Sequence, residues 1–219
     1  MAVNKESYTK LADELKKGTV KLVAVSKTKP IEDVMALYRL GQRDFGENYV
    51  QEIQEKQKVL PADIQWHFIG HLQSNKVKYI APFVHLIHGV DSLKLLTEIN
   101  KQAAKFNRII NCLLQVHIAD EETKFGFNET ELQAAVSELP ELNNVKITGL
   151  MGMASFTKDE VKLRAEFKYL KLLFNKYKAY NSVNCQMQIL SMGMSGDYKI
   201  AIEEGSNMVR IGSLLFGTR

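Results

Sequence analysis

The sequence predicts an α/β fold, a single (β/α)8 TIM barrel with an extra helix at its N-terminus. Short apolar runs alternate with helix-period segments along nearly the whole chain, eight such runs can be counted, and 219 residues fit one barrel of ordinary size. We expect residues 1–219 to form one domain, because no long linker rich in proline, glycine or serine divides the chain. The expected strands are Val20–Ser26, Arg43–Gly46, Gln65–Ile69, Val84–Val90, Ile109–His117, Lys146–Met151, Gln186–Ser191 and Asn207–Ile211.

Helical segments are expected before the first strand and between the strands. The first helix would carry Tyr8, Leu11 and Leu15 on one side and stop at Gly18. After the first strand, Pro30 opens a second helical pattern. A longer helix with a capping box from Thr157 to Glu160 carries the apolar series Leu163, Phe167, Leu170, Phe174 and Tyr177.

A doubly wound open sheet is the alternative architecture. Such a sheet normally carries a glycine-rich turn after its first strand, and here that position reads SKTKP. The chain also contains neither G-x-G-x-x-G nor G-x-x-x-x-G-K, which removes the usual dinucleotide and P-loop signatures. The barrel is therefore favoured.

Composition indicates a protein that is soluble, cytoplasmic and not bound to a membrane. Cys112 and Cys185 lie in apolar segments, which indicates buried thiols in a reducing compartment. The first 18 residues lack the apolar core of a signal peptide, and no stretch approaches the length of a membrane span. The net charge of +4 suits a small anionic ligand as well as nucleic acid, so it excludes neither class.

Lys27 lies at the end of the first expected strand, where chemistry gathers in a barrel. Burying an ammonium group there disfavours its charge, so a lysine at this place is suited, with a lowered pKa, to Schiff-base chemistry with an aldehyde. The structural alternative is a lysine whose stem packs at the strand end while its amine reaches solvent.

Two serine- and glycine-rich loops follow the last two expected strands. The segment SMGMSG contains Ser191, Ser195 and Gly196 before a helical pattern, and RIGS places Gly212 and Ser213 before another. Small residues and unpaired N–H groups at helix starts favour phosphate, and phosphate sites in barrels frequently lie in these two loops. Taken singly, each loop also fits an ordinary turn or cap.

Arg210 and the histidines need partners that the sequence does not identify. Arg210 lies in an apolar strand, so its guanidinium requires either a ligand acceptor or an internal carboxylate such as Glu203 or Glu47. His67 and His71 are four residues apart, but a strand and Gly70 put them out of helical register. No metal site is predicted.

Four motifs together resemble one known family. AVSKTKP, FGENYVQE, WHFIGHLQSNK and LSMGMSGDYKIAIEEGSNMVRIGSLLFG are similar to the YggS/PROSC family of pyridoxal phosphate homeostasis proteins, whose fold resembles the barrel domain of alanine racemase. The match runs from about Val20 to Gly217. The resemblance implies that pyridoxal 5′-phosphate (PLP) is held as a Schiff base on Lys27, whereas Lys29 forms none. It further implies the remaining cofactor contacts: Asn48 beside the ring, Ser191, Ser195, Gly212 and Ser213 on the phosphate, Arg210 facing the pyridine nitrogen, and His67 and Met192 lining the pocket.

The resemblance implies a role in PLP homeostasis, meaning cofactor supply or buffering without strong catalysis, and transient contact with apo-enzymes. An arginine at the pyridine nitrogen disfavours its protonation and weakens the ring as an electron sink. The alternative is a PLP-dependent racemase of small amino acids, which needs a second acid or base; Tyr49 and Tyr198 are the candidates here, and the racemase's own tyrosine comes from a second domain that this chain leaves no room for. Without that pairing domain we expect a monomer.

A docking module for nucleic acid or protein, using the basic face of residues 159–180, ranks last among the functions considered, and no nucleic-acid partner is predicted.

Overall fold

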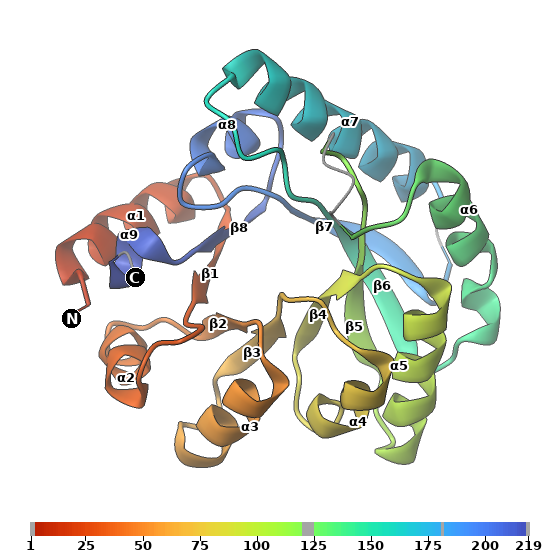
Figure 1. The fold of residues 1–219 in the computed structure, drawn as a ribbon, viewed down its shortest axis with the longest axis horizontal. Coiled ribbons are helices and arrows are strands. Elements are labelled where there is room, and N and C mark those ends of the chain that lie inside the picture. Colours follow the sequence, from red (N-terminus) through yellow and green to blue (C-terminus); the bar gives the residue numbers. More distant parts are fainter. Residues whose placement is uncertain (1–2, 120–124, 181, 218–219) are drawn as a thin grey trace.

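Eight parallel strands close into a barrel in sequence order (Figure 1). The computed structural model describes residues 3–119, 125–180 and 182–217. The strands are β1 Lys21–Val25, β2 Asp44–Glu47, β3 Gln65–Phe68, β4 Leu86–Val90, β5 Ile110–Gln115, β6 Val145–Met151, β7 Cys185–Ser191 and β8 Met208–Ile211. Each lies within two residues of its expected ends, and β1 pairs in parallel with both β2 and β8. The predicted (β/α)8 fold is confirmed.

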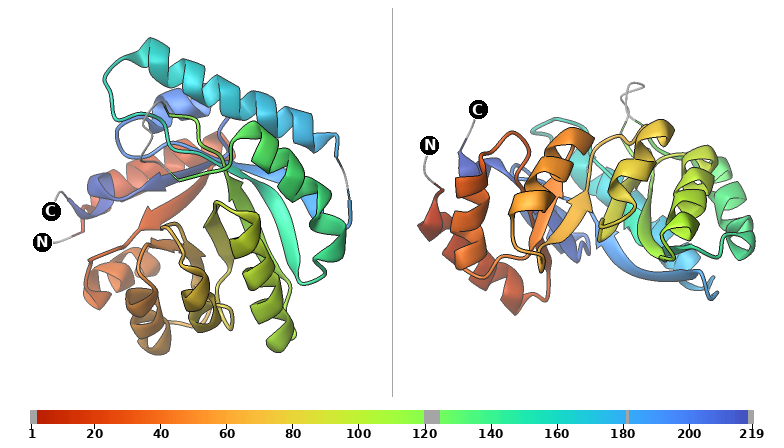
Figure 2. Two further views of the ribbon diagram at one scale, coloured as in Figure 1. Left: turned by 45° about the vertical axis from the view of Figure 1, so that its right-hand side comes forward. Right: turned by 90° about the horizontal axis from the view of Figure 1, so that it is seen from below.

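Helices surround the sheet on its outer face, as the two further views in Figure 2 show. The α-helices are α1 Lys5–Lys17, α2 Ile31–Arg39, α3 Val50–Val59, α4 Val77–Ile80, α5 Leu93–Lys105, α6 Glu129–Ser137, α7 Glu160–Lys178, α8 Tyr198–Glu203 and α9 Ser213–Phe216; 3-10 turns cover Ser74–Lys76 and Leu139–Glu141. The extra helix α1 lies beside α9, and the Asn4 N–H donates to the Leu215 carbonyl at 2.9 Å. Within the described ranges, no helix has both the length and the apolar character that crossing a membrane requires.

The start of α7 differs from the expectation. Its N-cap is Asp159, whose side chain accepts from the N–H groups of Val161 and Lys162 at 3.0 and 3.2 Å. Thr157 accepts the N–H of Asp159 at 3.1 Å instead, so the predicted capping box from Thr157 to Glu160 is wrong. A carboxylate two residues closer to the helix reaches two unpaired N–H groups, which a threonine further away does not.

Successive side chains of each strand point alternately into the barrel and outward, toward the helices. Val23, Met151 and Met208 belong to a small apolar cluster on the inner face, because their neighbours in the strands pack in the larger cluster under the helices. Arg210 and Val25 share this inner face two residues further along their strands. The strand period thus directs Arg210 into the barrel near the ends of the strands, where a site can form.

Candidate functional site

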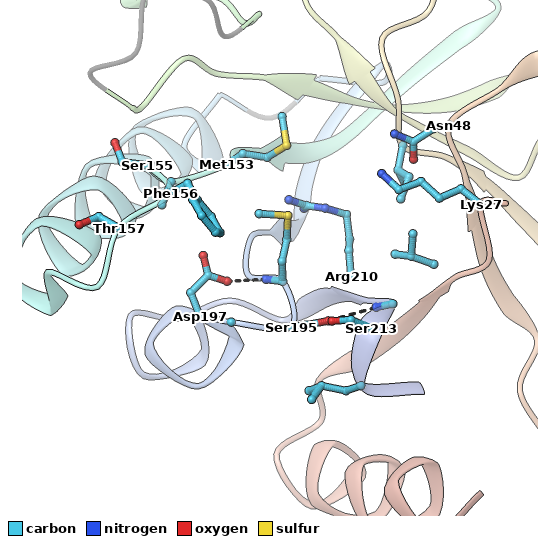
Figure 3. A pocket seen from close by; sticks show the side chains of 17 residues that line it. Lys27, Asn48, Met153, Ser155, Phe156, Thr157, Ser195, Asp197, Arg210 and Ser213 are labelled. Atoms are coloured by element: carbon cyan, nitrogen blue, oxygen red, sulfur yellow. Dashed lines mark hydrogen bonds between the residues drawn. The ribbon is translucent and has the colours of Figure 1, made fainter. Parts of the chain in front are cut away.

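A cavity of about 660 Å³ opens where the carboxyl ends of the strands meet (Figure 3). Its lining combines residues that follow β1, β2, β6, β7 and β8. Of the predicted site residues, the lining contains Lys27, Asn48, Ser195, Arg210, Gly212 and Ser213. Parallel strands bring these positions together, because their carboxyl ends all meet at one end of the barrel.

Lys27 projects into this cavity from a tight turn after β1 (Figure 3). The Lys29 N–H donates to the Ser26 carbonyl at 3.0 Å and closes the turn. Thr28 adopts φ 61°, a left-handed conformation that costs a non-glycine residue energy. Its N–H donates to a carboxylate oxygen of Glu52 at 2.5 Å, which compensates for that cost. The turn presents the Lys27 side chain to the cavity, and the Lys29 amine donates elsewhere, to the Phe216 carbonyl at 3.0 Å.

A buried ionic cluster of Lys56, Glu47 and Glu52 contacts the turn at Ser26. The Lys56 ammonium donates to the Ser26 carbonyl at 2.7 Å, to Glu47 at 2.7 Å and to Glu52 at 2.9 Å. The Ser26 hydroxyl donates to the same Glu47 oxygen at 2.6 Å. Burial raises the pKa of Glu47 to about 7, against the lowering effect of Lys56. Sequence reasoning missed Lys56, since nothing in the α3 pattern distinguishes a buried lysine from an exposed one.

Arg210 is almost fully buried and carries no carboxylate partner among the described residues. Its Nη1 donates to the carbonyl and the hydroxyl of Ser191 at 2.9 and 2.7 Å, and its Nη2 donates to the Gly152 carbonyl at 3.0 Å. Burial lowers the pKa of Arg210 to about 10. Neither carboxylate considered from the sequence pairs with Arg210, because Glu47 pairs with Lys56 and Glu203 with Arg164; the nearby Asp197 carboxylate raises the pKa of Arg210 against the larger effect of burial.

Guanidinium carries five N–H bonds, and the contacts above use three of those on Arg210. For the Nε–H and the second Nη2–H, the described part of the chain supplies no acceptor. Arg210 also lines the cavity. A ligand bound in the cavity would supply acceptors for these two N–H bonds.

Backbone N–H groups from the loops after β7 and β8 belong to residues that also line the cavity. Ser195 and Ser213 lie side by side in Figure 3, and the Gly212 N–H donates to the Ser195 hydroxyl at 3.3 Å. The N–H groups of Ser195, Gly196, Ser213 and Leu214 meet no acceptor in the described residues. Four such donors beside two hydroxyls form a cradle for an anion.

Asn48 contributes an unpartnered polar atom. Its side chain lines the cavity, and its buried Oδ1 meets no hydrogen-bond donor in the described residues. Gly70 packs against the Asn48 backbone, because a Cβ there would lie 2.7 Å from the Asn48 carbonyl oxygen. The close approach requires glycine and holds Asn48 at the cavity wall.

The loop after β6 forms another wall. Glu166 on α7 accepts the N–H and the hydroxyl of Ser155 at 2.7 and 2.6 Å, and both residues are buried. Ser155 lines the cavity together with the exposed Phe156. The expected strand Lys146–Met151 places this loop directly after a strand end, but the anchoring contact from Glu166 comes from tertiary structure.

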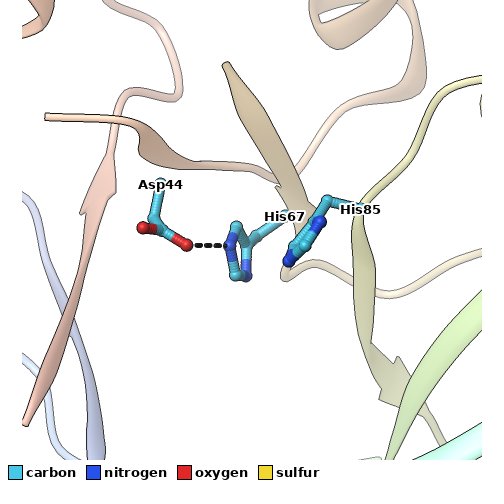
Figure 4. A group of neighbouring side chains, drawn as sticks. All are labelled: Asp44, His67 and His85. Carbon is cyan, nitrogen blue, oxygen red and sulfur yellow. Dashed lines mark hydrogen bonds and ion pairs between the residues drawn. The ribbon is translucent and has the colours of Figure 1, made fainter. Parts of the chain in front are cut away.

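Three predicted residues lie outside the lining: His67, Ser191 and Met192. Ser191 uses its hydroxyl on Arg210, and Met192 packs in the core beneath the helices. His67 points into the barrel interior below the cavity, with its ring nitrogens 2.9 Å from His88 and 2.9 Å from Asp44 (Figure 4). These three side chains therefore do not line the cavity, and a contact of any of them with a ligand stays a prediction.

Asp44, His67 and His85 bring three donor atoms within 4.8 Å of one another, as Figure 4 shows. The Asp44 oxygen that faces His67 also accepts from the Lys21 ammonium at 3.1 Å. His71, the other histidine of the four-residue spacing, lies elsewhere and contacts Asp91 at 2.9 Å. Hydrogen bonds within the protein therefore account for the Asp44–His67 contact. A metal cation bound to Asp44 there would have to displace the Lys21 ammonium.

Tyr49 and Tyr198, the tyrosines considered as a second acid or base, do not line the cavity. Tyr49 is half exposed at the start of α3, and Tyr198 packs its ring against the core under α8. Among the described lining residues, the ionisable side chains are Lys27, Asp197 and Arg210.

The fold and site define a class of barrel with a lysine facing a polar cradle, and comparison with known proteins gives the family. The family model for the N-terminal domain of alanine racemase matches residues 5–219. A pyridoxal phosphate homeostasis protein of Aquifex aeolicus is 42% identical over 200 residues, covering 91% of this chain and 87% of the relative. The Escherichia coli protein of the same name is 36% identical over 204 residues, covering 91% and 86%.

Solved structures agree with the sequence comparison. PipY of Synechococcus elongatus, solved with PLP bound, superposes with a TM-score of 0.88 at 34% identity, covering 97% of this chain and 99% of PipY. Alanine racemase of Clostridium difficile shares the fold, with a TM-score of 0.76 at 15% identity, and this chain spans 57% of it. The chain belongs to the family of pyridoxal phosphate homeostasis proteins, as its four motifs predicted.

Proposed function

We propose that this protein binds PLP through a covalent bond to Lys27 and serves the supply and buffering of the cofactor, with no strong catalysis of its own. One observation carries the proposal: Lys27, the buried Arg210 and the N–H cradle of Ser195 and Ser213 line the same cavity. Relatives named for PLP homeostasis, and PipY solved with PLP bound, support it.

The residues present fit the cofactor. Its phosphate carries the negative charge that four N–H groups and two hydroxyls favour. Its ring would offer acceptors to the two unused N–H bonds of Arg210, and Asn48, whose Oδ1 meets no donor among the described residues, lines the same cavity. Because the guanidinium only donates, an Arg210 contact to the pyridine nitrogen keeps that nitrogen unprotonated.

When bound, the cofactor supplies an aldehyde carbon and a conjugated ring that withdraws electrons. The Lys27 nitrogen would attack that carbon, water would leave, and a C=N bond would join protein and cofactor. An unprotonated ring nitrogen makes the ring a weak electron sink, which favours binding over turnover of amino acids.

The racemase alternative needs an acid or base opposite Lys27. Among the described lining residues no tyrosine or histidine is found, and Asp197 is occupied in accepting the Met194 N–H at 2.6 Å. These observations favour a carrier. Exchange of the α-proton of small amino acids in deuterium oxide discriminates between them: rapid exchange dependent on Lys27 would establish the enzyme instead.

The site is tested by borohydride reduction of the PLP-loaded protein followed by peptide mapping. We expect reduction to shift the absorbance of the bound cofactor and to leave it attached to Lys27. Lys27→Ala should lose the attachment, whereas Lys29→Ala, whose amine reaches the Phe216 carbonyl, should keep it. Attachment that survives Lys27→Ala at the same site would refute the assignment.

Delivery of PLP to apo-enzymes by transient contact, a monomeric state and the absence of a nucleic-acid partner belong to the same proposal. Sedimentation with and without an apo-enzyme tests the first two, and titration with duplex and single-stranded oligonucleotides at low salt tests the third. A stable dimer of this chain, or salt-sensitive oligonucleotide binding that survives Lys27→Ala, would contradict the corresponding part.

A further inference from the structure

A continuous series of hydrogen bonds crosses the barrel interior from Arg210 to Asp44. Arg210 Nη1 lies 2.7 Å from Ser191 Oγ, and Ser191 Oγ lies 3.2 Å from His88 Nδ1. His88 Nε2 lies 2.9 Å from His67 Nδ1, and His67 Nε2 lies 2.9 Å from Asp44 Oδ1. The three middle residues are fully buried, and the cavity does not reach them.

The two ends determine the direction of every bond in this series. A guanidinium can only donate, and an ionised carboxylate can only accept. Since the Asp44 carboxylate accepts, His67 carries its proton on Nε2, and its Nδ1 is then the acceptor for His88 Nε2–H. His88 Nδ1 in turn accepts from the Ser191 hydroxyl, whose oxygen accepts from Arg210. Each donor meets one acceptor only when both histidines are neutral Nε2–H tautomers.

The electrostatics of the buried groups agree with this assignment. Burial lowers the pKa of His67 and of His88 below the ordinary value, which keeps both rings neutral. The contacts with His67 and Lys21 lower the pKa of Asp44 against the opposing effect of burial. His85 and Lys21 also face His67, and the pKa of His85 is lowered by burial to about 4. At neutral pH the ends are therefore charged and the middle is neutral.

We propose that His88 and His67 are positioning residues for Arg210: their single-direction hydrogen-bond chain to Asp44 holds the guanidinium in place with two N–H bonds turned toward the cavity. The identity of the ligand rests on the proposed function, but the series of hydrogen bonds itself does not depend on that function. Fixing the Ser191 hydroxyl as a donor to His88 leaves its oxygen as an acceptor for Arg210 alone.

The hydrogen-bond series also helps Arg210 to stay charged without a carboxylate in hydrogen-bond contact; the Asp197 charge acts in the same direction, raising the pKa of Arg210 against burial. Its near acceptors are two carbonyls and one hydroxyl, all neutral. Aligned donors polarise one another toward the Asp44 carboxylate at the far end, in a low-dielectric interior where such alignment is effective. Without His88 the Ser191 hydroxyl would be free to rotate, and its hydrogen could then point toward Arg210 in place of the oxygen lone pair that accepts from the guanidinium.

The direction of the chain is tested by ¹⁵N NMR of the histidine rings in the protein without PLP. We expect His67 and His88 each to show a protonated Nε2 and an unprotonated Nδ1 at neutral pH. A protonated Nδ1 on either ring would overturn the proposal. This readout does not involve the cofactor, so it stands or falls separately from the function of Lys27.

The positioning role is tested with a matched pair of variants at His88. His88→Leu removes both ring nitrogens, whereas His88→Gln keeps an acceptor for Ser191 and a donor for His67 at similar spacing. We expect His88→Leu to weaken PLP binding about tenfold, the effect of about one buried hydrogen bond, and to shift the absorbance of the bound cofactor. His88→Gln should restore both to near wild type. His85→Phe, next to His67 with ring centroids 5.3 Å apart but outside the chain, serves as the control and should change neither.

Asp44→Asn keeps an acceptor for His67 but removes the charge, and it separates hydrogen bonding from electrostatics. We expect it to retain the tautomers and to shift the cofactor absorbance in the same direction as His88→Leu, by less. Thermal unfolding of each variant confirms that the barrel is intact; if His88→Leu does not fold, Ser191→Ala replaces it. Unchanged PLP binding and absorbance in a folded His88→Leu protein would refute the positioning role. If borohydride reduction of the wild-type protein left no PLP attached to Lys27, the proposed function would be refuted instead.

Discussion

Replacing Lys56 by methionine is expected to destabilise the folded protein strongly and in a pH-dependent way. Its ammonium is the shared partner of Glu47, which is fully buried, of Glu52, which is mostly buried, and of the Ser26 carbonyl. Methionine fills most of the lysine stem's volume, so the change removes charge with little loss of packing. It leaves a buried carboxylate and a carbonyl without their donor.

The magnitude follows from the burial of these partners. Removing one member of a buried ion pair costs about 3–5 kcal/mol in free energy of unfolding. Lys176 forms an ion pair with Glu129 at the same 2.7 Å, but both side chains are about half exposed. For Lys176→Met we expect about 0–1 kcal/mol, since exposed pairs contribute little. The two variants thus compare the same contact distance in different environments.

The pH dependence has a definite sign. Burial raises the pKa of Glu47 from an ordinary 4.5 to about 7, so its contribution to stability is complete below about pH 4.5 and is lost as the pH rises through 7. Without Lys56 the attraction that lowers this pKa is gone, and the pKa of Glu47 rises further. The loss in free energy of unfolding of Lys56→Met relative to wild type should therefore grow between pH 6 and pH 9.

The assay is equilibrium urea unfolding followed by fluorescence of the single tryptophan, Trp66, which is buried on strand β3. Measurements at pH 6, 7.5 and 9 give the deficit for both variants. A Lys56→Met deficit no larger than that of Lys176→Met, or one that shrinks as the pH rises, would show that this cluster does not act as a buried ion pair.

Three further predictions concern the cavity walls and the core. Gly70→Ala places a methyl 2.7 Å from the Asn48 carbonyl, and we expect about 1–3 kcal/mol of destabilisation and weaker PLP binding, measured by urea unfolding and by absorbance titration. Glu166→Gln keeps one acceptor for Ser155 but loses the charge, so unfolding should become easier by about 1–2 kcal/mol, and an unchanged stability would argue against this anchor. Burial raises the pKa of both cysteine thiols, so a thiol reagent at pH 8 should modify them only after urea unfolds the chain; rapid modification of the native protein would contradict that burial.

Much of the barrel was predictable because its signals are local. The run before Lys27 reads as a strand, and Gly212 and Ser213 read as a loop before a helix, without knowledge of any distant residue. The capping box of α7 was assigned wrongly, since Thr157 and Asp159 both suit a cap and only backbone geometry selects between them. Residues that follow strands were found at the cavity because parallel strands of a barrel end together.

Partners were not predictable in the same way. Lys56 and Glu166 look like ordinary helix residues, and only the packing of α3 and α7 against the strand ends reveals them as anchors of the turn at Ser26 and the loop at Ser155. His67 was placed in the pocket by resemblance, but its depth along the strand puts it in the barrel interior.

The sequence by itself determined which segments become strands, that eight of them close into a barrel, and that Lys27, Arg210 and two serine-rich loops share its mouth, because periodicity and strand order are properties of the chain read locally. Tertiary structure alone decided that Arg210 would hydrogen-bond to two carbonyls and a hydroxyl with no carboxylate in direct contact among the described residues, and that His67 and His88 would join Ser191 to Asp44. A hydrogen bond between residues far apart in sequence depends on distances of a few tenths of an ångström, and those distances exist only once the strands have packed.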